Sequence, residues 1–193
     1  MPDVLPNLSR AALLSMDLQS AIVSIYTQQG KDDFLSRVAG VQAWARARKI
    51  PILHLQVGFR PGLPEVGSRN SLFAAIKKSA QWQQLFQGPA GAIHPAVAPQ
   101  GDDIVITKHR ISAFAGTDLE MILRANEIDT LILMGIATSG VVLATLLAAT
   151  DADYGVLVVK DCCADQDPEV HACLTEKVFS RLATVVRSQE LIA

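Results

Sequence analysis

The chain has no run of basic residues and no long apolar segment free of helix breakers. Its 193 residues carry 17 Lys and Arg against 19 Asp and Glu, so the net charge is only −2. This balance provides no electrostatic footprint for a nucleic acid. A transmembrane helix needs about 18 or more consecutive apolar residues, which the sequence does not offer. We therefore expect neither a nucleic-acid partner nor a membrane partner.

Cysteine is scarce, and the usual cofactor motifs are missing. The three cysteines are odd in number and two of them are adjacent, which suits a reduced protein better than a disulfide framework. The polar, proline-containing start of the chain is unlike a signal peptide. We therefore expect a cytoplasmic protein. No Gly-x-Gly-x-x-Gly or Walker-type sequence occurs, so the sequence does not indicate a bound nucleotide, and we expect no cofactor.

The four histidines do not show the spacing of metal ligands. His54 lies inside an apolar segment of strand length, where a hydrogen-bonded core or pocket histidine is more common than a ligand. We therefore expect no metal.

Short apolar segments alternate with segments of helical spacing along the chain. Helices are expected over residues 31–49 and 71–86, and a capping box at Thr117 and Glu120 predicts a short one. Asp167-Pro168 is a helix start, with Asp as the N-cap. Strands are expected over residues 11–16, 51–57, 103–107, 130–134, 156–160 and 183–186. This alternation predicts an α/β three-layer sandwich in which a six-stranded parallel sheet carries helices on both faces. We expect a single domain over residues 1–193.

Polar residues stand where several of these strands end. Asp17 follows the first strand, Lys108 follows the third, and a turn over residues 135–141 follows the fourth. Carboxyl ends of parallel strands meet at one sheet edge, where ligands of open α/β sheets bind. An Asp and a Lys in a partly buried pocket keep each other charged, and the lysine can neutralise charge developing on a substrate. An ordinary surface ion pair is the alternative.

Three segments resemble the isochorismatase-like hydrolase superfamily, which has a Rossmann-like fold. They are LLSMDLQ, ITKHRISAFAGTDLE and LILMGIATSGVVLATLLAATDADYGVLVVKDCCAD, and the resemblance covers nearly the whole chain. The cysteine hydrolases of this superfamily use an aspartate, a lysine and a cysteine, and the first two positions match Asp17 and Lys108. The family pattern Gly-x-x-Thr-x-x-Cys-Val places Val141 where the cysteine would stand. An isopropyl group cannot attack a carbonyl, so thioester chemistry at this position is excluded.

Other side chains near the turn could in principle replace the missing nucleophile. Ser139 and Thr138 are close in sequence, but each needs a base directed at its oxygen. Cys162 and Cys163 follow the fifth predicted strand near the same edge, where packing is the commoner role of small buried cysteines.

The isochorismatase branch of the superfamily has a route that needs no cysteine. The resemblance implies that the aspartate protonates an enol-ether carbon and that water attacks the resulting cation. Asp17 can do this only if it holds a proton near neutral pH; burial raises its pKa and Lys108 lowers it. Gln56 resembles a substrate-contacting glutamine of that branch. The resemblance also implies a non-proline cis peptide bond near Ala137-Thr138, which turns N–H groups toward the substrate.

Further candidate substrate contacts lie in the loop over residues 58–70 and beside the strand ends. Phe59 and Arg60 could supply an aromatic wall and a carboxylate clamp, although Arg60 could equally anchor the loop or a subunit interface. Arg110 near Asp17 would stabilise the carboxylate. The remaining candidates are Gln19, Phe114, Ala137, Thr138, Ser139, Gly140 and Val141.

Two functions remain open. The first is a cysteine-independent hydrolase of a small metabolite, with Asp17 as acid and base, Lys108 as its charge partner and a bound water. The second is a non-catalytic ligand-binding or assembly protein that keeps the fold and the pocket. The superfamily commonly forms dimers or larger oligomers and the predicted helices are rich in Ala and Leu, so we expect a homo-oligomer.

Overall fold

The structure, a computed structural model, describes residues 7–193; residues 1–6 of the predicted domain lie outside this range. Its centre is a six-stranded parallel sheet with the strand order β3-β2-β1-β4-β5-β6, as predicted for the fold class. The strands are β1 (Ala11–Met16), β2 (Ile52–Val57), β3 (Ile104–Lys108), β4 (Thr130–Ile136), β5 (Gly155–Ala164) and β6 (Thr184–Val186).

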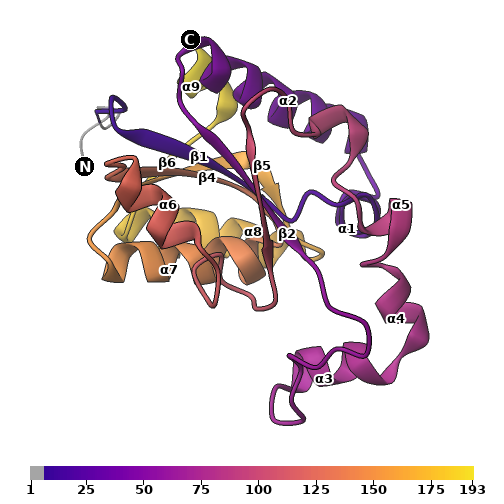
Figure 1. The fold of residues 1–193 in the computed structure, drawn as a ribbon. Helices are drawn as coiled ribbons and strands as arrows, with labels where there is room; N and C mark the ends of the chain where they lie inside the picture. Colours follow the sequence, from indigo (N-terminus) through magenta and orange to yellow (C-terminus); the bar gives the residue numbers. More distant parts are fainter. Residues whose placement is uncertain (1–6) are drawn as a thin grey trace.

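Helices cover both faces of the sheet (Figure 1), which gives three layers. On one face lie α2 (Lys31–Ala47) and α9 (Ser188–Ile192), and on the other lie α6 (Leu119–Ala125), α7 (Leu143–Asp151) and α8 (Pro168–Cys173). The remaining helices are α1 (Ser20–Tyr26), α3 (Ser71–Lys78), α4 (Ala80–Gln84) and α5 (Gly88–Gly91). No helix of the described residues is both long enough and apolar enough to cross a membrane.

Two apolar clusters hold the layers together. Phe34, Val38 and Trp44 of α2 pack on one face, and Leu123 of α6 and Leu146 of α7 pack on the other. All of these side chains are nearly or fully buried. Because strand residues alternate between faces, each inner strand feeds both clusters, which is why these strands read as continuous apolar runs.

Several element boundaries differ from the sequence prediction. Strand β5 extends to Ala164, because its second half pairs with the end of β4 after a register shift. The helix predicted over 71–86 is broken into α3 and α4 at Ser79, which has extended backbone angles and caps α4 through its hydroxyl. The capping box predicted at Thr117 does not form: α6 begins after Asp118, and the Thr117 hydroxyl donates to the Ala113 carbonyl. The predicted cap at Asp167 is confirmed.

The strand order reverses between β1 and β4, whose carboxyl ends lie side by side. From β1 the chain adds β2 and then β3 on one side of the sheet, and from β4 it adds β5 and then β6 on the other side. The connections therefore diverge at this point, which is the usual ligand position in open α/β sheets.

Candidate active site

Asp17 stands at the point where the strand order reverses. It follows the last residue of β1, and its backbone N–H donates to the carbonyl of Leu55 in the neighbouring strand β2 at 2.8 Å. Its φ angle of +55° is in the left-handed region, which non-glycine residues adopt infrequently. The strand therefore ends here, and the carboxylate is held at the sheet edge by backbone geometry.

Lys108 reaches Asp17 from the end of β3, as the strand-end argument predicted. Its Nζ lies 2.7 Å from Asp17 Oδ2 and also donates to the Arg110 carbonyl at 3.1 Å. Lys108 is 1% exposed and Asp17 is 6% exposed. The pair is thus a buried ion pair and not the surface pair that the sequence had left open.

The second carboxylate oxygen of Asp17 has no partner. Oδ1 is buried and accepts no hydrogen bond from the described residues. Burial raises the pKa of Asp17 above its usual value, and the Lys108 ammonium lowers it, with burial the larger influence. Lys108 therefore holds one carboxylate oxygen, while the other is buried without a hydrogen-bond partner among the described residues.

The turn after β4 lies beside the end of β1, the strand that Asp17 follows. A cis peptide bond joins Ile136 to Ala137, one bond earlier than the position considered from the sequence. Gly135 has a φ of +144°, and a Cβ there would lie 2.1 Å from the Met16 carbonyl oxygen. Only glycine allows β4 to approach the end of β1 this closely.

The turn continues as a wide, π-helical segment, η2 (Thr138–Val142), which leads into α7. Gly140 interrupts the helical backbone angles, and the N–H groups of Gly140 and Val142 both donate to the Ala137 carbonyl, at 3.1 and 3.2 Å. Ala137 is half-buried and Ser139 is exposed. Predicted residues 137–141 are therefore brought together as one compact turn.

Two residues that the sequence did not single out hold this turn. The Asp165 carboxylate accepts the Ser139 N–H at 2.7 Å, and His171 Nδ1 lies 2.8 Å from the hydroxyl of the fully buried Thr138. A hint was available, because Asp165 follows a buried strand in the same way as Asp17. Tyr26 lies near both carboxylates: burial first, then Asp165 and Asp17, raise its pKa.

Val141 is 3% exposed and belongs to the apolar cluster on the α6–α7 face. Phe114, half-buried, packs against the same cluster and contacts Tyr154 with tilted rings whose centroids lie 6.0 Å apart. The side chain at position 141 is thus part of the apolar core.

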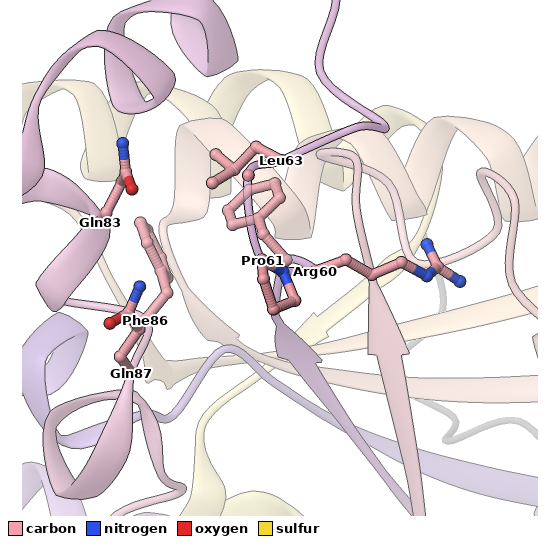
Figure 2. Close-up of a pocket in the computed structure, with 8 residues that line it drawn as sticks. Arg60, Pro61, Leu63, Gln83, Phe86 and Gln87 are labelled. Atoms are coloured by element: carbon pink, nitrogen blue, oxygen red, sulfur yellow. The ribbon is translucent and has the colours of Figure 1, made fainter.

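The loop after β2 builds a pocket of its own. Phe59 packs edge-on against Phe86, with centroids 5.6 Å apart, and also against Phe73. The cavity, about 320 Å³, is lined by Phe59, Arg60, Pro61, Gly62, Leu63, Gln83, Phe86 and Gln87. Figure 2 shows Gln83, Phe86 and Gln87 opposite Pro61 and Leu63, with the Arg60 guanidinium directed away from them. Arg60 Nη1 instead lies 3.7 Å from Glu65 Oε1.

Three predicted substrate contacts have other partners. The Arg110 guanidinium forms no ion pair with Asp17; it donates to the backbone carbonyls of His109 and Glu65, at 2.6 and 2.9 Å. These bonds hold the Arg110 side chain against the loop after β2. Gln56 lies on the strand face opposite Lys108, because residues alternate along β2, and donates to the Thr107 hydroxyl at 3.1 Å.

Gln19 is the third of these predicted contacts. It is fully buried, and its side chain exchanges hydrogen bonds with the backbone of Val57, at 2.8 and 2.9 Å, and donates to the Gly91 carbonyl. These bonds join the chain after β1 to the loop after β2.

Cys162, Cys163 and His54 are buried in the packed layers. Cys162 and Cys163 lie within β5, not after it, and each joins a different face of the core. Burial raises the pKa of both thiols, that of Cys163 to about 12, so neither forms a nucleophilic thiolate near neutral pH. His54 is buried with Nε2 3.2 Å from Asp103, and burial lowers its pKa. Among residues 7–193, no group of three His, Cys, Asp or Glu side chains is placed to hold a metal.

The fold and site define a class of doubly wound α/β protein with a buried Asp–Lys pair beside a strand–turn–helix. Within this class, residues 11–190 match the family model described as the Isochorismatase domain, and the chain belongs to this family of hydrolases. The chain spans most of the length of the relatives below.

Two curated relatives illustrate the range of the family. The maleamate amidohydrolase of Pseudomonas putida is 28% identical over 157 residues, covering 81% of this chain and 71% of that protein. The probable isochorismatase of Pseudomonas chlororaphis is 29% identical over 190 residues, covering 95% of this chain and 85% of that protein. An isochorismatase family protein from Burkholderia thailandensis has a similar structure, with a TM-score of 0.82, 27% identity, and coverage of 94% and 93% of the two chains.

Proposed function

We propose that this protein hydrolyses a small, anionic metabolite without a cysteine nucleophile, using Asp17 as general acid and base. The observation that carries the proposal is the buried Asp17 carboxylate, whose Oδ2 is held by Lys108 at 2.7 Å while Oδ1 has no partner. An unpartnered buried polar atom is costly to maintain, which favours a functional reason for it.

The proposed chemistry begins with protonated Asp17. Because burial raises its pKa, the carboxyl group is able to hold a proton closer to neutral pH than an exposed one. Oδ1 gives this proton to the substrate carbon of an enol ether, and a water molecule adds to the resulting cation. The proton that the water releases returns to Asp17, and the hydrated product then separates into a carbonyl compound and an alcohol. Lys108 keeps the carboxylate oriented and balances its charge after the proton has left.

The neighbouring residues fit substrate binding around this centre. The Ala137–Gly140 turn also carries backbone N–H groups, of which the Ser139 N–H is taken by Asp165 and the Gly140 N–H by the Ala137 carbonyl. Phe59 lies in a loop that is joined to the end of β3, because the Gly58 N–H donates to the Lys108 carbonyl at 3.1 Å. Changes of the loop are therefore expected to affect substrate preference more than chemistry.

The second candidate is a ligand-binding protein without turnover, and the burial of Val141 favours it. Val141, Asp17 and Lys108 are all nearly buried. In this reading Val141 fills the position from which a nucleophile would act, and the Asp17–Lys108 pair is kept for binding or stability.

The deciding experiment compares the native protein with Asp17→Asn on enol ethers, N-carbamoyl compounds and primary amides. Asp33→Asn, an exposed change in the first turn of α2, is the matched control. We expect turnover of one class that falls by about 100-fold or more in Asp17→Asn and is retained in the control. Turnover that is equal in Asp17→Asn, or binding of a panel compound with no turnover, removes the hydrolase proposal.

A further inference from the structure

The turn after β4 is held from outside by one short segment of the chain. Two consecutive turn residues are anchored there. The Thr138 hydroxyl lies 2.8 Å from His171 Nδ1, and the Ser139 N–H donates to the Asp165 carboxylate at 2.7 Å. Asp165 is the first residue after β5, and His171 belongs to α8, which packs against the turn. Two titratable side chains of one segment therefore fix neighbouring residues of the turn.

Burial sets the direction of the hydrogen bond between Thr138 and His171. Thr138 is fully buried, and His171 Nδ1 is the only hydrogen-bond partner of its hydroxyl among residues 7–193. A buried hydroxyl proton without an acceptor is costly, so the hydroxyl donates and Nδ1 accepts. Nδ1 accepts only when it carries no proton, which places the proton of the neutral ring on Nε2. This hydrogen bond therefore requires a neutral His171.

The surroundings of His171 favour the neutral ring. Burial lowers its pKa below the ordinary value of 6.5 and is the largest influence; Asp165 and Glu176 raise the pKa, and Lys160 lowers it. The turn itself carries no titratable side chain. A lowered pKa in the folded state means that the stability of this arrangement is present above the ordinary value and is lost as pH falls through the lowered pKa. The charged or titratable side chains near the ring are Lys160 on β5, Asp165 and Asp167 before α8, Glu169 and Cys173 on α8, and Glu176 after it.

Protonation of His171 would disturb both anchors of the turn. Both ring nitrogens of a charged histidine are donors. Nδ1–H would then face the Thr138 hydroxyl, whose proton would lose its only acceptor among the described residues. The cationic ring would also be attracted to the Asp165 carboxylate, which already accepts the Ser139 N–H. The two anchors are therefore coupled to one protonation event.

We propose that His171 is a positioning residue: the neutral ring holds the turn through Thr138, and protonation of the ring releases the turn beside Asp17. The turn begins at Gly135, which pairs with Met16, the residue before Asp17. Movement of the turn therefore changes the surroundings of the carboxyl group. The consequence for substrate rests on the proposed hydrolysis, whereas the consequence for the turn does not.

An NMR titration tests the effect on the turn. Side-chain nitrogen shifts report which ring nitrogen of His171 is protonated, and backbone amide shifts of residues 138–140 report the turn. We expect the proton on Nε2 at high pH, and turn amides that shift with the midpoint of His171. In His171→Asn, Oδ1 is attached to Cγ as Nδ1 is and accepts the same bond without titrating, so these shifts should disappear. Val170→Ala, a change of an exposed neighbour on α8, is the control and should titrate like the native protein.

A change of the partner separates the hydrogen bond from mere packing. Thr138→Val removes the donated proton and keeps the shape of the side chain. The neutral ring then loses a stabilising bond, so the pKa of His171 should rise, and Thr138→Ser should restore it. If Thr138→Val does not fold, the comparison of His171→Asn with the native protein still decides, because it leaves the hydroxyl in place.

Activity provides a second measurement once a substrate is known from the panel above. On acidification the KM of the native protein should rise with the midpoint of His171, while kcat changes less. His171→Leu, which has no acceptor, should raise KM about tenfold at every pH, and His171→Asn should keep a low KM without this pH dependence.

Four results would overturn the inference. They are turn amides that do not follow His171, a proton on Nδ1 at high pH, an unchanged pKa of His171 in folded Thr138→Val, and a KM that stays constant through the midpoint. A protein that gives the expected NMR results but turns over no panel compound supports the role of His171 in the turn and removes only the proposed hydrolysis.

Discussion

Replacing Lys108 by Met should make stability depend strongly on pH, because it leaves the Asp17 carboxylate buried without its cation. At the observed 2.7 Å, two unit charges in a medium of effective dielectric constant about 20 attract by about 6 kcal/mol. Desolvation of both ions offsets much of this in the native protein. Removing one partner of a buried pair nevertheless costs about 3–5 kcal/mol, since the remaining charge is uncompensated.

The sign of the pH dependence follows from the direction of the pKa shift. The pKa of Asp17 in the folded protein is raised above the ordinary value of 3.8, and losing Lys108 raises it further. A group with a raised pKa in the folded state stabilises below its unfolded pKa, and that stability is lost as pH rises through the folded pKa. The Lys108→Met variant should therefore be least stable to unfolding near neutral pH. Its stability should partly recover as the pH is lowered toward the ordinary carboxyl pKa.

Urea unfolding of the native protein, each single variant and the double variant Asp17→Asn/Lys108→Met measures these terms. We expect the double variant to lose less than the sum of the single variants by about 2 kcal/mol or more, because it leaves no unpaired charge. Lys108→Gln replaces Lys108→Met if the latter does not fold. A loss that is equal at acid and neutral pH, or additive losses, would refute the reasoning.

Three further changes probe the turn and its supports. Position 141 matches the family's cysteine by resemblance, so the thiol of Val141→Cys should alkylate faster than Cys163, whose pKa is about 12, and peptide mass spectrometry measures both; equal rates would contradict that correspondence. Gln19→Ala should lower the free energy of unfolding by about 3 kcal/mol, because it leaves buried backbone groups of Val57 and Gly91 unpaired; a loss below about 1 kcal/mol in urea unfolding argues against this. Gly135→Ala should prevent stable folding, since its Cβ would overlap a backbone carbonyl at 2.1 Å; a native melting temperature would disprove the requirement for glycine.

The sequence alone determined the architecture and the identity of the central residues. Alternating strand and helix patterns predicted the six-stranded parallel sheet. Strands that are buried on both faces must be apolar along their whole length, and such short apolar runs are visible in the sequence. Asp17 and Lys108 could be placed at one edge because parallel strands end on the same side.

Only the tertiary structure decided how these residues are used. The sequence does not indicate that the side chains of Gln19, Gln56 and Arg110 would form hydrogen bonds with other loops and strands of the protein. Their partners are distant from them in the chain, so no local pattern reveals these bonds. The roles of Asp165 and His171 likewise depend on where α8 lies. Burial of Asp17 is a property of the packed layers, and burial is what turned a possible surface ion pair into a carboxyl group with a raised pKa.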